Sequence, residues 1–171
     1  DVVSVENISS QMYGFADIGK PKVEALAKHL EYFAGVTPEM KAIRYEKGQL
    51  SGIVICAVDS MSARRQVFAG QAGLSVGSPL VIDPRMGAEF AAVHTYRPMD
   101  MNTCESYAKT LHSDQDSVPE PCTAKATSYC SRALASLVAV TVKSFLKKER
   151  YAKVVQYHIP TLDMMSFMRQ A

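Results

Sequence analysis

The chain has 171 residues, of which 47% are apolar and 21% are charged, so it is long enough and apolar enough to bury a hydrophobic core. Its formal net charge of +2 is too small to indicate a nucleic-acid partner or an anionic membrane surface. No apolar run approaches the roughly 20 residues that a membrane span needs, and no signal-peptide pattern is present. We therefore expect a single domain over residues 1–171, with neither a nucleic-acid nor a membrane partner.

Strands and helices are expected to alternate along the chain, judged from the spacing of apolar residues. This alternation predicts an α/β fold with a mostly parallel sheet. In chain order we expect a strand at 2–5, a helix at 22–33, strands at 40–45 and 52–58, a helix at 63–72, strands at 79–83 and 89–96, a helix at 123–147 and a strand at 151–159.

Two of these elements carry most of the fold prediction. Residues 52–58 form a continuous apolar run, which is typical of a parallel strand buried on both faces, and Asp59 follows its carboxyl end. The helix at 123–147 contains the apolar run 133–142, which is broken by polar residues and followed by lysines. We therefore expect a core helix there rather than a membrane span.

Residues 97–121 are polar and rich in Asp, Ser, Thr and Pro, with no periodicity. This composition predicts a long loop. Loops of this length inside a compact domain are usually functional, so we expect a functional loop at 97–121.

Cysteine usage indicates the compartment. The four cysteines, Cys56, Cys104, Cys122 and Cys130, form no C-x-x-C pair. Four scattered cysteines fit a reducing cytoplasm better than a secreted disulfide framework. A four-cysteine zinc site usually comes from two closely spaced pairs, so we expect a cytoplasmic protein without a zinc site.

Polar residues with characteristic spacings follow two of the predicted strands. Asn7 and Gln11 form an Asn-x-x-x-Gln pattern, and Lys22 closes the segment Asp-Ile-Gly-Lys-Pro-Lys. Asp59 ends a buried strand, with Arg64 five residues further on. In this order, the motifs resemble the ThiF/MoeB/E1-like superfamily of adenylyltransferases, which activate ubiquitin-like proteins and sulfur carriers.

The resemblance implies both a fold and a chemistry. The fold is Rossmann-like, with ligands bound at the carboxyl ends of parallel strands. Members use ATP and Mg²⁺ to adenylate the C-terminal glycine of a ubiquitin-like or sulfur-carrier protein, as homodimers or as E1-like heterodimers. By position, Asn7, Gln11, Lys22, Asp59 and Arg64 match residues of the ATP site, and Asp59 matches the Mg²⁺-associated aspartate.

Each of these residues also has an ordinary structural interpretation. Asn7 and Gln11 are residue types common in turns and caps. Lys22 suits the solvated first turn of a helix, and Asp59 suits a helix N-cap.

The chain departs from the family pattern in two ways. Ser10 stands where the family commonly has the arginine of Asn-x-x-Arg-Gln, and Lys20 is a possible substitute for that charge. The Gly-rich phosphate loop and the ribose-binding aspartate are expected upstream of Asp1, so the N-terminal βαβ start is missing. We expect a truncated piece of a longer protein rather than a degenerate member, and we expect this chain alone to bind ATP poorly and to be inactive.

Cys122 is the candidate nucleophile. It precedes the predicted helix, where many family members carry the residue that forms a thioester or an acyl disulfide with the carrier. A helix N-terminus lowers the pKa of a thiol and favours the thiolate. The alternative is a small buried residue in a capping segment, with Thr123 as the N-cap.

Two further residues lie in regions that are functional in relatives. Cys104 lies near the position of a C-x-x-C in zinc-bearing relatives, but its partner cysteine is absent here. Arg85 follows a predicted strand and could reach a phosphate or the carrier tail; the alternative is a residue in a surface turn.

Two other functions stay open. The protein could be a non-catalytic E1-like partner subunit that kept the fold and lost the chemistry, which Ser10 and the missing loop favour. It could also be a degenerate or plain Rossmann-like nucleotide-binding module, although no dinucleotide fingerprint is present.

Overall fold

The computed structural model describes residues 1–46, 48–73, 77–113 and 127–168. The chain forms two compact units. The N-terminal unit comprises residues 1–45 with 127–129, and the sheet unit comprises the described residues of 46–126 and 130–171.

The N-terminal unit contains α1 (Val5–Ile8), the 3₁₀ turn η1 (Phe15–Asp17) and α2 (Lys22–Ala34), together with the first two residues of α5 (Ser128–Leu146). Helix α2 ends at Gly35, which adopts the left-handed conformation (φ 63°) that a glycine C-cap favours, so the helix predicted at 22–33 is confirmed. The strand predicted at 2–5 is wrong, because Val2 forms only an isolated bridge to Pro21 and the first helix begins at Val5.

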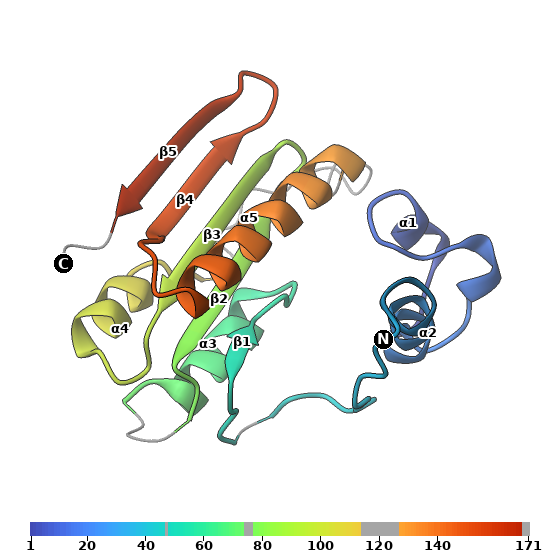
Figure 1. Cartoon of the computed structure of the whole chain (residues 1–171), viewed down its shortest axis with the longest axis horizontal. Coiled ribbons are helices and arrows are strands. Elements are labelled where there is room, and N and C mark those ends of the chain that lie inside the picture. The colour runs from blue at the N-terminus through green and yellow to red at the C-terminus, as the bar shows by residue number, and fades with distance from the viewer. Residues whose placement is uncertain (47, 74–76, 114–126, 169–171) are drawn as a thin grey trace. The chain divides into compact units, whose positions relative to one another are not determined.

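The sheet unit is built on five strands: β1 (Ile53–Ile55), β2 (Leu80–Met86), β3 (Phe90–Tyr96), β4 (Ala152–His158) and β5 (Asp163–Met168). Their spatial order is β1-β2-β3-β4-β5 (Figure 1). Strands β1 and β2 are parallel, and the three other pairings are antiparallel.

In the described part of the chain, three helices flank this sheet: α3 (Met61–Gln71), α4 (Met101–Ala108) and α5 (Ser128–Leu146). Figure 1 shows α5 crossing one face of the strands. The core on that face joins β2 and β3 to α5, through Leu80, Ile82, Ala91, Val93, Cys130 and Leu134. Because side chains alternate along a strand, the residues between these positions point to the opposite face.

The opposite face packs against α3 and α4. The ring of Phe68 on α3 lies 5.3 Å from that of Tyr96 on β3 and 5.4 Å from that of Tyr107 on α4. The rings of Tyr96 and Tyr107 are stacked, with centroids 4.4 Å apart. These aromatic contacts fix both helices on the face that also carries Asp83, Arg85 and His94.

The predicted α/β fold with helices flanking a sheet is confirmed, but the sheet is mixed rather than mostly parallel. The connection from Met86 to Phe90 is too short for a crossover and forces an antiparallel pair. Strand β1 lies at an edge of the described sheet. The strand predicted at 40–45 is wrong, because these residues form no regular secondary structure.

Two other predictions need correction. Helix α4 lies inside the predicted loop 97–121, because Asp100 caps it by accepting a hydrogen bond from the backbone N–H of Thr103 (3.3 Å). Strand β5 was not predicted, since its Met-rich sequence lacks the alternation typical of a strand. It forms by pairing with β4 and leaves its side chains exposed.

Helix α5 is long and apolar enough to cross a membrane, by length and composition only. One of its faces packs on the sheet through Cys130 and Leu134, as expected for a core helix, while Val140 and Leu146 are exposed.

Candidate functional site

Asp59 lies at the carboxyl end of β1, immediately before α3. The backbone N–H of Cys56 still donates to Ile82 O (2.8 Å), and the chain then leaves the sheet. Ser60 caps α3, its Oγ accepting from Ala63 N–H (3.2 Å), so the alternative interpretation of Asp59 as the N-cap is wrong. The exposed Asp59 carboxylate makes no hydrogen bond or ion pair with any residue that the structure describes.

This position suits a hydrated cation beside phosphate. Mg²⁺ in nucleotide sites is held by one or two carboxylates and completes its shell with phosphate oxygens and water. The N-terminus of the eleven-residue α3, which begins two residues after Asp59, carries the positive end of a helix dipole and favours anions. Across residues 1–46, 48–73, 77–113 and 127–168, no three His, Cys, Asp or Glu side chains group to hold a metal ion. A cation at Asp59 would therefore depend on nucleotide oxygens and water.

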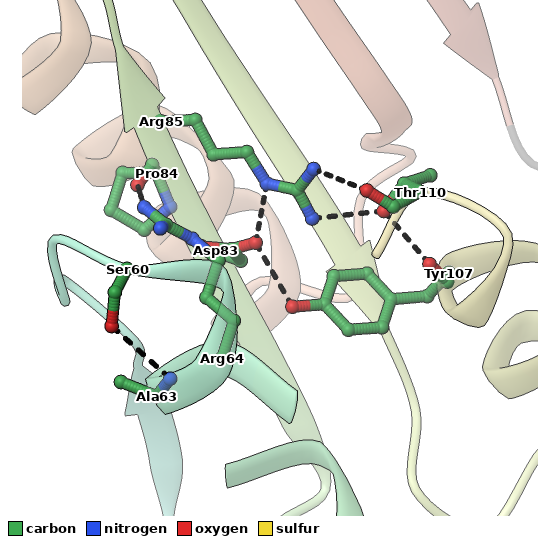
Figure 2. Close-up of polar contacts among 8 residues, drawn as sticks. All are labelled: Ser60, Ala63, Arg64, Asp83, Pro84, Arg85, Tyr107 and Thr110. Carbon is green, nitrogen blue, oxygen red and sulfur yellow. Dashed lines mark hydrogen bonds and ion pairs between the residues drawn. The ribbon is translucent and has the colours of Figure 1, made fainter. Parts of the chain in front are cut away.

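Beside this loop, the fully buried carboxylate of Asp83 on β2 holds three donors (Figure 2). Arg64 Nε donates to Oδ1 (2.9 Å), while Arg85 Nε (2.7 Å) and the hydroxyl of Tyr107 (2.9 Å) donate to Oδ2. Arg85 also donates through Nη1 to Thr110 O (2.9 Å) and through Nη2 to Thr110 Oγ1 (2.8 Å). These contacts join α3, β2 and the end of α4, and we call the five residues the Asp83 cluster.

The Asp83 cluster includes two residues that the sequence analysis singled out, Arg64 and Arg85. The guanidinium of Arg64 points inward to Asp83 and is only 8% exposed. Arg85 lies within β2 rather than in a surface turn, so that alternative is wrong. The nucleotide-binding role of Arg64 and the phosphate or carrier contact of Arg85 stay predictions.

Pro84 shows why β2 can continue past the end of β1. Ile82 O accepts a hydrogen bond from β1, and alternate residues of a strand direct their backbone groups to the same side, so the backbone of Pro84 also faces that side. Because β1 ends before Pro84, the missing N–H of Pro84 breaks no hydrogen bond between strands. Pro84 O instead accepts from Arg64 Nη2 (3.4 Å). The strand therefore runs to Met86 and brings Arg85 into the cluster.

Burial shifts the protonation of the groups around Asp83. Burial, together with the carboxylate of Asp83, raises the pKa of Cys56 to about 11, so this thiol is protonated. Burial, reinforced by the charge of Arg85, lowers the pKa of His94 to about 4, so this histidine is neutral at pH 7. Burial also raises the pKa of Tyr107, whose hydroxyl therefore remains a donor to Asp83.

Two buried polar atoms near the cluster, His94 Nδ1 and the hydroxyl of Tyr96, find no hydrogen-bond partner within the described part of the chain. His94 pairs across the strands with Asp83. A neutral imidazole is the form that such a site tolerates best.

The other predicted ATP-site residues lie in the N-terminal unit. Asn7 Oδ1 accepts from the backbone N–H of Ser4 (3.0 Å), which is a helix-capping contact, and Gln11 is exposed just past α1. Lys22 begins α2, and its Nζ lies 3.8 Å from the exposed carboxylate of Asp1. The Asp1 side chain is 81% exposed and that of Lys22 is 26% exposed, so solvent weakens this ion pair.

Lys20, the possible substitute for the missing arginine, pairs instead with Asp17 (3.3 Å). Asp17 also accepts from Gly14 N–H (3.0 Å) and lies 2.9 Å from His29 Nε2. The hydrogen bond from Gly14, followed by that of His29, lowers the pKa of Asp17 to about 2. This arrangement fixes the loop that leads into Lys22.

The structure brings Asn7, Gln11 and Lys22 into one unit, and Asp59 and Arg64 into the other. Convergence of the two groups on one ligand stays a prediction. Cys122 and residues 114–121 of the predicted loop lie outside the described residues.

The other three cysteines, Cys56, Cys104 and Cys130, are free and buried. Burial raises the pKa of Cys104, and its Sγ donates to Arg97 O (3.4 Å). Neither property suits a nucleophile.

Asp83, Tyr107 and Thr110 were missed as members of the site. One signal was present in the sequence: Asp83 ends the apolar run Leu80–Ile82, and a charged residue in a buried strand needs a charged or hydrogen-bonding partner. The partners themselves lie 19 and 24 residues away in Arg64 and Tyr107, beyond the reach of local patterns.

No protein-family model matches this chain, and no curated protein matches it. Solved structures do match. The crystal structure of selenomethionine PaaA has a TM-score of 0.61 at 14% identity, covering 98% of this chain and 62% of PaaA. E. coli MccB with ATP has a TM-score of 0.68 at 13% identity, covering 98% of this chain and 54% of MccB.

A second MccB structure, with AMPCPP and MccA, has a TM-score of 0.67 at 13% identity over 98% of this chain and 54% of that chain. This chain thus spans between half and two thirds of the length of the proteins it matches. At such low identity the likeness is one of fold. This chain therefore has the fold of the matched parts of PaaA and MccB.

Proposed function

We propose that the protein containing this chain uses ATP and Mg²⁺ to adenylate the C-terminal carboxylate of a peptide or small protein. The observation that carries the proposal is the position of Asp59 at the carboxyl end of β1, directly before the N-terminus of α3, with an exposed carboxylate that has no partner among the described residues. The fold shared with MccB, which has been crystallised with ATP and with MccA, supports it.

In this reaction an oxygen of the substrate carboxylate attacks the α-phosphorus of ATP. The bond from that phosphorus to the oxygen bridging to the β-phosphate breaks, and pyrophosphate leaves with the electron pair. The products are an acyl adenylate and pyrophosphate, with no oxidation or reduction.

Two residues of this chain are assigned to this step. The Asp59 carboxylate would bind Mg²⁺, and bound Mg²⁺ supplies charge stabilisation to the phosphates. Lys22 would bind a phosphate as a point charge, because its only ion pair within the described residues is the 3.8 Å contact with the exposed carboxylate of Asp1. Asn7 and Gln11 would complete the nucleotide contacts.

The finer assignment follows the resemblance of the sequence motifs. The substrate would be the C-terminal glycine of a ubiquitin-like or sulfur-carrier protein, and the active form would be a homodimer or an E1-like heterodimer in the cytoplasm. Cys122 would then accept the activated carrier as a thioester or acyl disulfide.

ATP–pyrophosphate exchange by the full natural protein tests the adenylation step. Asp59→Ala should lower the exchange rate by about 100-fold or more, the scale of losing one preorganised charge-stabilising contact in a transition state. Asp163→Ala, which removes an exposed carboxylate on β5, is the matched control and should leave the rate unchanged. Exchange that survives Asp59→Ala would contradict the assignment of Mg²⁺ to Asp59.

The transfer step is tested separately. Cys122→Ala should leave pyrophosphate exchange running but remove any covalent carrier adduct on a non-reducing gel, because transfer needs a thiolate and adenylation does not. Cys104→Ala should affect neither step, since Cys104 is buried and protonated. Loss of the adduct in Cys104→Ala alone would show that the wrong nucleophile was assigned.

A second candidate is a non-catalytic E1-like partner subunit. Ser10 in place of arginine and the inward orientation of Arg64 both leave less positive charge for phosphates. This candidate predicts no exchange by the purified natural protein with any substrate, and no effect of Lys22→Ala on the activity of its complex.

A further inference from the structure

We propose that Asp83 is a positioning residue for the adenylation step: through Arg64 it holds the start of α3, and therefore Asp59, where Mg²⁺ must bind. This inference rests on the proposed function. It assigns Arg64 to the protein framework rather than to the nucleotide.

The geometry of Arg64 supports this role. Arg64 is the fourth residue of α3, so it lies at the end of the first helical turn. Its Nε donates to Asp83 Oδ1 (2.9 Å) and its Nη2 to Pro84 O (3.4 Å), so two adjacent residues of β2 bind one guanidinium. The first turn of α3 is thereby tied to β2.

Asp83 is itself held in one orientation. Its second carboxylate oxygen accepts from both Arg85 and Tyr107, and Arg85 is fixed in turn by two hydrogen bonds to Thr110. Figure 2 shows these donors converging on the carboxylate from opposite sides. Because Asp83 is fully buried, each contact acts in a medium of low dielectric constant and is stronger than at the surface.

Asp59 needs such support because it has none of its own. Its carboxylate is exposed and unpaired among the described residues, so its position depends on the backbone between β1 and α3. On one side that backbone follows a strand of only three residues, and on the other it enters a helix through the Ser60 cap. Misplacement of a catalytic group by about 1 Å can lower a rate by about 100-fold.

The competing assignment makes Arg64 a phosphate ligand. The Asp83 cluster contains two guanidinium groups and one carboxylate, so its net charge is positive and would attract an anion. Under that assignment Arg64→Lys would raise the KM for ATP, whereas Asp83→Asn would not change it. Under the positioning role, both substitutions would raise the Mg²⁺ concentration needed for half-maximal rate, and the double variant would show no larger increase than either single variant.

Hydrogen exchange of the ligand-free natural protein tests positioning without any activity. Asp83→Asn should speed exchange of the Ala63–Arg65 amides by about tenfold, while amides of β3 change by less than about twofold. The single amide oxygen can still accept from Arg85 and Tyr107, whereas the amide NH₂ group cannot accept from Arg64. Tyr107→Phe is the control, since it removes one donor and keeps the Arg64 pair. Unchanged α3 amides, or equal acceleration everywhere, would overturn the proposal.

Kinetics provide the second readout. In pyrophosphate exchange, Asp83→Asn and Arg64→Lys should each raise the Mg²⁺ concentration for half-maximal rate by about fivefold, leave the KM for ATP at saturating Mg²⁺ unchanged, and combine without further effect. A raised KM for ATP in Arg64→Lys alone would overturn the proposal. If the wild-type protein shows no exchange, the proposed function fails, and the hydrogen-exchange result still decides whether Asp83 positions α3.

Discussion

The two units each contain a buried aspartate, and the two aspartates are used in opposite ways. Asp17, in the N-terminal unit, takes all its partners from residues 14–29 and so organises one local loop. Asp83, in the sheet unit, takes its partners from two helices and its own strand, across 19 residues on one side and 24 on the other. One carboxylate shapes a loop, and the other connects elements that are distant in the sequence.

The two aspartates also differ in burial, and burial determines how much each charge contributes to the stability of its unit. The side chain of Asp17 is 12% exposed and keeps some contact with water, whereas Asp83 is fully buried. Removing one partner from a fully buried ion pair leaves an uncompensated charge, which costs much more than losing a partly hydrated one. We therefore expect truncation of Asp83 to alanine to destabilise the whole sheet unit, and truncation of Asp17 to affect only its loop.

The largest effect is expected for Asp83→Ala. It leaves Arg64 and Arg85 buried without their carboxylate and should lower the free energy of unfolding by about 3–5 kcal/mol, measured by urea denaturation. Glu105→Ala, an exposed position on α4, should stay within about 0.5 kcal/mol of wild type. If the two variants unfold at the same urea concentration, the comparison between the aspartates fails.

The next effect is a dependence on pH. The folded-state pKa of His94, about 4, lies below its ordinary value of 6.5. Between these two pH values His94 is therefore protonated in the unfolded chain but neutral in the folded chain. The stabilising contribution of neutral His94 is complete above pH 6.5, and the free energy of unfolding should fall by about 3 kcal/mol as the pH is lowered towards 4. Urea midpoints measured along this range for wild type and His94→Gln should show that the variant loses most of the slope.

His158→Gln is the matched control for that experiment, because His158 is exposed on β4. It should keep the wild-type dependence on pH. A slope that persists in His94→Gln would assign the acid sensitivity to other groups.

The smallest effect is local and belongs to Asp17. Because its pKa is lowered from 3.8 to about 2, Asp17 stabilises the loop above pH 3.8 and loses this contribution as the pH falls towards 2. Hydrogen exchange of the Gly14 and Lys20 amides, followed by NMR, should become faster over that pH range, whereas exchange of the β3 amides should be independent of the protonation of Asp17. Asp17→Asn should abolish this transition; an effect of the variant on β3 amides would show that Asp17 too acts globally.

The sequence predicted well those elements that local patterns determine. Helix α2 has apolar residues at helical spacing and a glycine at its end, and β3 and β4 alternate or continue as apolar runs. Strand direction was predicted poorly, although the short, Gly-containing link from Met86 to Phe90 was a readable sign of a hairpin. Helix α4 was missed because its signal is one cap, Asp100, within a polar stretch.

For the candidate site, the sequence located Asp59 at a strand end and Lys22 at a helix start, since each follows from an element boundary. It could not show that Arg64 turns inward, because Asp83 and Tyr107 meet it only when β2, α3 and α4 are packed together. Long-range ion pairs of this kind depend on tertiary structure, and residue spacing alone does not predict them.

The most direct test of the proposed adenylation is the identity of the products formed by the full natural protein from ATP, Mg²⁺ and a peptide or carrier with a free carboxyl terminus. The account predicts pyrophosphate and a substrate that gains AMP at its C-terminal carboxylate, detected by mass spectrometry, with both absent in Asp59→Ala. Release of ADP with phosphorylation of the substrate, or AMP transfer that persists in Asp59→Ala, would contradict it.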